Sequence, residues 1–234
     1  MSWTLNTFED NPTLVMQLAA SIASTLAESI DLRGRASLAV SGGGTPRTLF
    51  DALSGIDIPW SNVMITLVDE RWVDENDPAS NALLVRRHLL RSHAAGAQFL
   101  GLKNADRDPA LAVTAVDKQL REALLPLDLA VLGMGEDGHT ASFFKDAEGL
   151  EAALAPDTLT ACCAVRPPRA PHARMTLTLN TLLASRRLLL HIVGAGKLAV
   201  LQEAMQPGPV NARPVRAVLH QQRRPLEIYY ATRE

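Results

Sequence analysis

The sequence has few cysteines and no stripe of basic charge. Its 234 residues include only two cysteines, Cys162 and Cys163, which are adjacent and so poorly placed to pair with each other. We therefore expect no disulfide framework, which fits a reducing compartment such as the cytoplasm. The 23 basic and 25 acidic residues are mixed along the chain and leave a formal net charge of −2, so nothing indicates a nucleic-acid partner.

Membrane, targeting and metal-binding signals are also missing. No apolar run reaches the roughly 18 residues of a membrane span, and no basic region followed by an apolar run marks a signal peptide at Met1. The six histidines and two cysteines show no metal-ligand spacing, so we expect no metal site. Internal repeats and low-complexity tracts are absent from the sequence as well.

Apolar strand-like runs alternate with helix-like periodic segments over most of the chain. Continuous apolar strands between helices are typical of a mainly parallel sheet covered on both faces. We predict one α/β domain over residues 1–234, doubly wound and Rossmann-like, with room for a small subdomain near residues 140–180. Ligands of such folds bind at the carboxyl ends of the strands. We expect strands at 36–40, 63–68, 127–132, 188–193 and 226–231, and helices at 12–29, 46–53, 80–93, 109–125, 197–205 and 211–220.

The first strand at 36–40 runs directly into Ser41-Gly-Gly-Gly-Thr45-Pro46. Three glycines allow successive amide groups to point at one spot, Thr45 suits a helix N-cap and Pro46 suits the first helical turn. A helix N-terminus with free amides is a ready phosphate site, whereas the alternative is a tight turn without a ligand. No Gly-Lys-Ser/Thr follows, so the loop is not a Walker A motif.

Two further loops follow predicted strands. Asp69-Glu70-Arg71 places two carboxylates and a cation at a strand end, where Arg71 could bind an anion and Asp69 could face a reacting carbon. The alternative is a surface salt-bridge cluster. The third loop runs from Gly133 to Ser142 and matches the dinucleotide fingerprint GxGxxG, but no strand ending in an acidic residue about 20 positions later supplies a ribose partner.

The third loop is better interpreted through Asp137 and His139. Histidine accepts and returns a proton near neutral pH, and an acid two positions before it could orient the ring. Two cations also lie near predicted strands: Arg174 in Arg174-Met-Thr-Leu, and Lys197 after Val193-Gly-Ala-Gly. Taken singly, each of these cations could equally be an ordinary surface residue.

These loops together resemble the 6-phosphogluconolactonase family. The matching segments are 41–46, 69–73 with Ser80-Asn81, 133–144, 174–179 and 193–197, in the family's order. The family is similar in fold to glucosamine-6-phosphate deaminases and ribose-5-phosphate isomerases. Gly44 stands where the family often has Ser, Arg or Asn, Lys145-Asp146 replaces the usual Pro-Gly, and Asn180 replaces a common Pro. We therefore expect the loop after His139 to differ in shape from that of the family.

The resemblance implies hydrolysis of 6-phospho-D-glucono-1,5-lactone to 6-phosphogluconate, without a metal or organic cofactor. The partner is then a small sugar-phosphate lactone, and the protein is a monomer or a homodimer. His139 would activate water and Asp137 would orient His139, with Asp69 as the other catalytic candidate. The turn around 135–140 would supply oxyanion donors. The substrate- and phosphate-binding residues would be Ser41, Gly42, Gly43, Gly44, Thr45, Arg71, Arg174 and Lys197.

Three other functions remain open at this point. A glucosamine-6-phosphate deaminase would share the phosphate loop and use Asp69 as its base, but its histidine motif typically continues Gly-His-Ile-Ala-Phe-Asn-Glu. Here Gly138-His139 is followed by Thr-Ala-Ser-Phe-Phe, without the Asn-Glu pair. A sugar-phosphate sensor of a transcription regulator would need a DNA-binding segment, yet only one helix is expected before residue 36. An NAD-dependent dehydrogenase is the third alternative.

Overall fold

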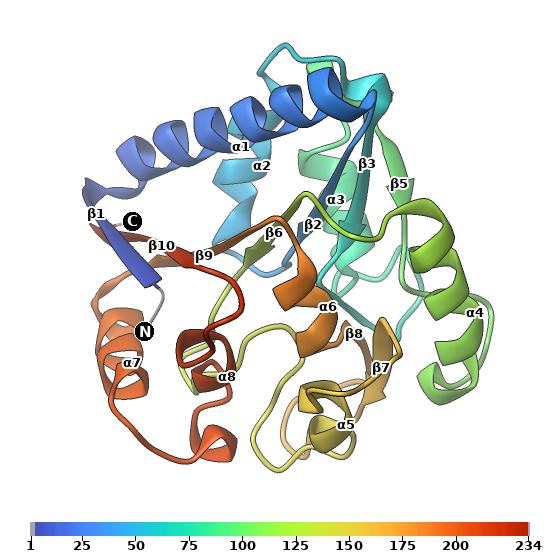
Figure 1. Cartoon of the computed structure of the whole chain (residues 1–234), viewed down its shortest axis with the longest axis vertical. Coiled ribbons are helices and arrows are strands. Elements are labelled where there is room, and N and C mark those ends of the chain that lie inside the picture. The colour runs from blue at the N-terminus through green and yellow to red at the C-terminus, as the bar shows by residue number, and fades with distance from the viewer. Residues whose placement is uncertain (1–2, 234) are drawn as a thin grey trace.

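Seven parallel strands form the centre of the computed structural model, which describes residues 3–233 (Figure 1). Every pair of neighbouring strands in this sheet is parallel. The mainly parallel sheet expected from the sequence is therefore confirmed. In spatial order the strands are β1 (Trp3–Asp10), β10 (Leu226–Arg233), β9 (Arg187–Val193), β6 (Leu129–Leu132), β2 (Ala36–Val40), β3 (Val63–Leu67) and β5 (Gln98–Leu100).

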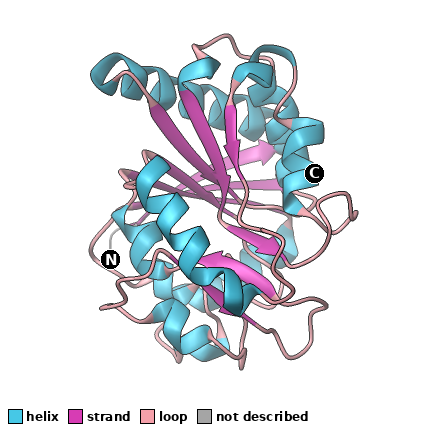
Figure 2. Ribbon diagram, turned by 90° about the vertical axis from the view of Figure 1, so that its right-hand side faces the viewer, coloured by secondary structure: helices cyan, strands magenta, loops and turns pink. Residues whose placement is uncertain are grey.

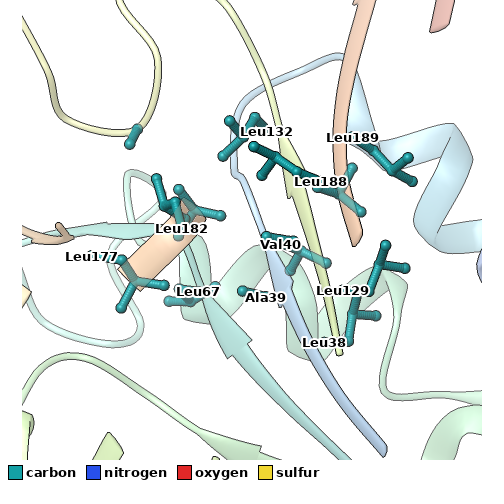
Figure 3. Packing of buried hydrophobic residues seen from close by; sticks show 14 of the residues in the cluster. Leu38, Ala39, Val40, Leu67, Leu129, Leu132, Leu177, Leu182, Leu188 and Leu189 are labelled. Carbon is teal, nitrogen blue, oxygen red and sulfur yellow. The ribbon is translucent and has the colours of Figure 1, made fainter. Parts of the chain in front are cut away.

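The inner strands are buried on both faces, which explains their continuous apolar runs. Every residue of β2 and β6 is buried. Leu38 pairs with Leu129 in the β2–β6 register, and the two side chains lie together in the core (Figure 3). Leu177 and Leu182 lie beside Leu67 (Figure 3), so the hydrophobic core extends from the parallel sheet to the segment that contains residues 177–182.

Helices cover both faces of the sheet (Figure 2). The helices α1, α2 and α3 contact one another in sequence and form one layer, while α6, α7 and α8 contact one another elsewhere. The helices are α1 (Asn11–Arg33), α2 (Pro46–Ser54), α3 (Asn81–His88), α4 (Pro109–Ala123), α5 (Leu150–Leu154), α6 (Leu179–Ala184), α7 (Ala195–Met205) and α8 (Arg216–Leu219), with 3-10 turns at Trp60–Asn62, Ser92–Gly96 and Val210–Ala212.

Helix α1 is the longest element, with 23 residues. Asp10 caps it by accepting a hydrogen bond from the Thr13 amide, and Gly34 ends it in the left-handed conformation that favours glycine. By length and composition alone α1 could cross a membrane, but half of its apolar stretch is buried inside the molecule. It contacts α2 and the strands β1, β2 and β10, which is the packing of a core helix.

A second, antiparallel sheet lies beside the first. It consists of β4 (Asp69–Arg71), β8 (Arg174–Leu177) and β7 (Cys162–Val165), in that order. The Leu177 amide donates to the Val68 carbonyl, which joins this sheet to the end of β3. The register places Arg71 opposite Arg174, so two predicted binding residues about 100 positions apart lie side by side. The subdomain expected near 140–180 stays a prediction.

The strand order creates a switch point between β2 and β6. After β2 the chain moves to β3 on one side, whereas after β6 it moves to β9 on the other. Right-handed crossovers then leave the two strands toward opposite faces of the sheet. The carboxyl ends of β2 and β6 therefore border an open crevice, the usual place for a ligand in such sheets.

Several expected boundaries were wrong. The first strand is β1 rather than 36–40, and the helix expected over 12–29 spans 11–33. The helix expected from Ser80 to His93 ends at His88, and the one expected over 211–220 is a 3-10 turn followed by the short α8. The Val215 amide donates to the Gly138 carbonyl, so a distant loop holds this last segment out of a regular helix.

Asp128 fastens the amino ends of the strands, opposite the crevice. Its Oδ2 accepts hydrogen bonds from the Ser37 amide (2.8 Å) and hydroxyl (3.2 Å). Its Oδ1 lies 2.7 Å from a guanidinium nitrogen of Arg33 and 3.2 Å from Nε of Arg186. This buried carboxylate therefore joins the end of α1 to β2 and β6.

Asp128→Ala should lower the free energy of unfolding by about 2–4 kcal/mol, because it leaves a buried amide, a hydroxyl and two guanidinium groups without their acceptor. Urea denaturation measures this loss, and activity should stay near wild type. The matched control is Asp51→Ala, whose 45% exposed carboxylate pairs with His88 and Arg91. Such exposed pairs contribute about 1 kcal/mol or less, so equal losses in the two variants would contradict the assignment.

Candidate active site

The loops after β2 and β6 border a cleft of about 250 Å³ at the switch point. The Gly133 amide donates to Ser41 Oγ at 3.1 Å and ties the two loops together. Every site residue predicted from the sequence lines this cleft except Asp137, which contacts it through His139. Within residues 3–233, no group of three His, Cys, Asp or Glu side chains is placed to hold a metal ion. The lining residues that the sequence predicted are Ser41, Gly42, Gly43, Gly44, Thr45, Asp69, Arg71, His139, Arg174 and Lys197.

The glycine loop presents unused backbone donors. In the part of the chain that the structure describes, no hydrogen bond uses the amides of Gly42, Gly43 or Gly44. Thr45 occupies the N-cap position of α2, but its backbone angles are helical and its side chain accepts no hydrogen bond from the first turn. The expected capping role is therefore wrong. Thr45 Oγ1 instead accepts a hydrogen bond from Lys197 Nζ at 3.1 Å. The loop, the threonine and the ammonium group thus surround one anion-sized space.

Two of the three loop glycines are required by their surroundings. A Cβ on Gly42 would lie 1.8 Å from Asn81 Oδ1, and Gly43 has a φ of +100°, which favours glycine. A Cβ on Gly44 would meet nothing within 4 Å, so a larger residue would fit there. Asn81 in turn donates to the Asp69 carbonyl at 2.8 Å.

The two adjacent carboxylates have different surroundings. Glu70 is buried and accepts hydrogen bonds from the amides of Asn81 and Ala82 and from the Ser80 hydroxyl, so it anchors the start of α3. Burial raises the Glu70 pKa above its usual value, although these amide hydrogen bonds oppose the shift. Asp69 faces the cleft, and its Oδ2 accepts a 2.5 Å hydrogen bond from Ser142 Oγ.

The two arginines of the second sheet have guanidinium nitrogens without partners. Arg174 is 6% exposed, lies 3.7 Å from Asp69 Oδ2 and stacks over Phe144, 5.3 Å from the ring centroid. Burial lowers the Arg174 pKa, and the Asp69 carboxylate partly offsets this. Arg71 donates to the Ala79 carbonyl. Within residues 3–233, the Nε atoms of both arginines are buried without an acceptor, which suits them to an anionic ligand.

His139 and Asp137 form a close pair at the mouth of the cleft. His139 Nδ1 lies 2.5 Å from Asp137 Oδ1, and the His139 amide donates to the same oxygen. The hydrogen bond from His139 lowers the Asp137 pKa from 3.8 to about 2, so the carboxylate stays charged near neutral pH. The His139 ring stacks on Phe144 at a centroid distance of 4.2 Å. The pair therefore has a fixed orientation that leaves Nε2 available.

The glycines of the third loop serve this pair rather than a dinucleotide. A Cβ on Gly135 would lie 2.2 Å from His139 Cε1 and 2.7 Å from Asp137 Oδ1. Gly138 has a φ of +81° and packs against Arg213, whose guanidinium reaches the Asp137 carbonyl at 3.4 Å. The amides of Gly135, Gly138 and His139 all donate within the turn. Those three amides cannot be the oxyanion donors expected from this turn.

Two polar residues at or next to the cleft, His191 and Ser142, were not among the predicted site residues. His191, in β9, lines the inner end of the cleft and is 3% exposed. Its only sequence signal was a polar side chain inside an otherwise apolar strand. Burial, with a smaller effect from Lys197, lowers the His191 pKa from 6.5 to about 4. Ser142 was the other omission, and only its hydrogen bond to Asp69 reveals its role.

Gly135→Ala should sharply reduce activity, because the new methyl group displaces the His139–Asp137 pair. Gly133→Ala is the matched control in the same loop, since its Cβ would meet nothing closer than 3.8 Å. We expect a loss on the order of 10²-fold for Gly135→Ala, as for other misplacements of catalytic groups by about 1 Å, and a small change for Gly133→Ala. Initial rates and far-UV circular dichroism measure both, and equal rates in the two folded variants would contradict this prediction.

Known proteins resemble the chain over nearly its whole length. The family model for glucosamine-6-phosphate isomerases/6-phosphogluconolactonase matches residues 9–227. A 6-phosphogluconolactonase of Mesorhizobium japonicum is 43% identical over 230 residues, which cover 98% of this chain and 96% of the relative. One from Pseudomonas aeruginosa is 43% identical over 91% of this chain and 88% of its own length.

Solved structures give the same result. The crystal structure of a 6-phosphogluconolactonase from Shewanella baltica superposes with a TM-score of 0.95 at 44% identity, covering 98% of this chain and 97% of that one. A monomeric glucosamine-6-phosphate deaminase shares the fold, with a TM-score of 0.77 at 16% identity. From the family match and these relatives, the chain belongs to the glucosamine-6-phosphate isomerase/6-phosphogluconolactonase family.

Proposed function

We propose that this protein hydrolyses 6-phospho-D-glucono-1,5-lactone to 6-phosphogluconate in the oxidative pentose phosphate pathway. One observation carries the proposal: His139, oriented by Asp137, lines the same cleft as the glycine loop and Lys197. Hydrolysis of a phosphorylated lactone needs one group that binds the phosphate and another that transfers a proton at the lactone carbonyl. The relatives named 6-phosphogluconolactonase support the same reaction.

The phosphate binds at the glycine loop. It carries about −1.5 to −2 charges near neutral pH, and helix N-termini with free amides stabilise such charge. The donors are the amides of residues 42–44, the Thr45 hydroxyl and the Lys197 ammonium group. Arg71 and Arg174 contact substrate oxygens between this loop and the histidine.

The reacting end uses His139 as a general base and then as a general acid. Because Nδ1 is hydrogen-bonded to Asp137, Nε2 faces the attacking water. Nε2 accepts a proton from that water as its oxygen bonds to the lactone carbonyl carbon. The bond from that carbon to the ring oxygen then breaks, and His139 returns the proton to the departing oxygen. Asp137 stabilises the charged ring between these steps.

The tetrahedral intermediate needs donors for its oxyanion. Since the amides of Gly135, Gly138 and His139 already donate within their turn, we assign this task to the Arg71 guanidinium. Its Nε lies buried without an acceptor among the described residues, so the intermediate would satisfy a donor that the free enzyme leaves unpaired. We expect the protein to act in the cytoplasm as a monomer or a homodimer.

The direct test is a pH-stat assay with freshly generated lactone, corrected for spontaneous hydrolysis. We expect hydrolysis of the phosphorylated lactone, unchanged by a metal chelator, and no ammonia release from glucosamine 6-phosphate. Activity lost in the chelator and restored by a divalent metal would overturn the metal-free mechanism. Turnover of glucosamine 6-phosphate with an inert lactone would favour the deaminase, with Asp69 as its base.

His139→Asn should fold normally and lose about 10²–10⁴-fold in turnover, because asparagine keeps hydrogen-bonding capacity but cannot transfer a proton near neutral pH. His88→Asn is the matched control, since this histidine pairs with Asp51 outside the cleft. With a pKa of about 2, Asp137 stays ionised above about pH 4, so any acid limb between pH 5 and 7 belongs to another group. Near wild-type turnover in His139→Asn would move the base to Asp69.

A further inference from the structure

His191 is the one polar side chain at the inner end of the cleft that no step above uses. It lies in β9 between Leu190 and Ile192, two residues before the strand ends. Its ring lines the cleft together with Val40, Phe50 and other residues from β2 and α2. An apolar side chain would suit these neighbours, so the imidazole needs a separate explanation.

The imidazole has an unsatisfied nitrogen. Nε2 of His191 is fully buried and has no hydrogen-bond partner among residues 3–233. Buried polar atoms normally have partners, and an unpaired one destabilises the fold. Nδ1 has no hydrogen-bond partner among these residues either, but it is not fully buried, so it is the ring nitrogen that a ligand in the cleft can reach.

The surrounding charge indicates which ligand this is. Burial lowers the His191 pKa, and Lys197, which contacts Thr45 at the glycine loop, lowers it further. The ring is therefore neutral near physiological pH, with one N–H to donate. An oxygen that Lys197 and the loop amides attract is anionic, and an anionic oxygen is the stronger acceptor for that N–H.

We propose that His191 forms the inner wall of the phosphate subsite and donates its ring N–H to a phosphate oxygen of the substrate. It is a specificity residue: it favours phosphorylated over unphosphorylated lactones and takes no part in proton transfer. The inference rests on the proposed lactonase function, but its phosphate-binding part can be measured without turnover.

The test uses His191→Leu, which removes both ring nitrogens, and His191→Gln, which keeps a donor. The matched control is Ile192→Leu, a buried change in the same strand outside the cleft. His191→Leu should lose about tenfold or more in kcat/KM for the phosphorylated lactone and little for unphosphorylated gluconolactone, as expected for a charge-assisted hydrogen bond. His191→Gln should retain part of this preference, and Lys197→Ala is the positive control for its loss.

Thermal denaturation with inorganic phosphate supplies a second measurement. Without phosphate, His191→Leu should melt at or above the wild-type temperature, because an unpaired buried nitrogen is gone. It should need about tenfold more phosphate than wild type for the same rise in melting temperature. If His191 had only a structural role, its replacement would lower the melting temperature and leave the protection by phosphate unchanged.

Three outcomes would overturn the proposal. Equal losses on both lactones would indicate a structural role, and unchanged phosphate protection would indicate that a buried water satisfies the nitrogen. A His191→Leu chain that fails to fold would show that the ring is paired in the free protein. If wild type lacks lactonase activity, the proposed function fails, while the phosphate titration still decides the role of His191.

Discussion

The parallel pairing of β2 with β6 is the constraint on which the cleft depends. Because the chain leaves these strands toward opposite faces, no crossover covers their carboxyl ends. The hydrogen bond between Ser41 and Gly133 then fixes the distance between the two loops. His139 lies in the turn that starts at Gly133, and Lys197 reaches Thr45 from the first turn of α7, which follows β9. The sheet thereby places the glycine loop, Lys197 and His139 around one cleft.

Several polar groups that border the cleft have no hydrogen-bond partner in the described chain. The amides of 42–44, the Nε atoms of Arg71 and Arg174, and the imidazole of His191 all lack acceptors or partners there. Three of the seven buried side-chain atoms without a partner among residues 3–233 belong to this cleft. Unpaired buried groups lower stability, and several at one place are typical of a binding site. Asp69 is the only carboxylate that lines this cleft among residues 3–233, and Ser142 and Arg174 both contact it. The cleft of the free protein thus has more hydrogen-bond donors than acceptors, which favours an anionic ligand.

The sequence predicted the elements and site residues whose causes are local. The buried strand 36–40 and the Ser80 cap follow from composition and short-range chemistry, and the structure has both. Elements that depend on distant contacts were missed. The strands β7 and β8 are only four residues long; they pair with each other, and β8 also pairs with β4. Thr45 has a cap-forming side chain, but Lys197, 152 positions away, engages it instead. The position of His191 at the cleft could not be predicted, because an apolar strand pattern indicates which residues are buried but not which of them border a cavity.

The order of strands also has a consequence for synthesis. Among the described strands, β1 comes first in the sequence and pairs with β10 alone, and β10 comes last. While the ribosome is still adding the carboxyl-terminal residues, β1 has no neighbour and the sheet ends at β9. Contacts between chain segments this far apart form late and slow the final step of folding. The nascent chain therefore carries β1 without a strand partner until β10 is made, and this eight-residue strand then pairs with β1 and β9 together.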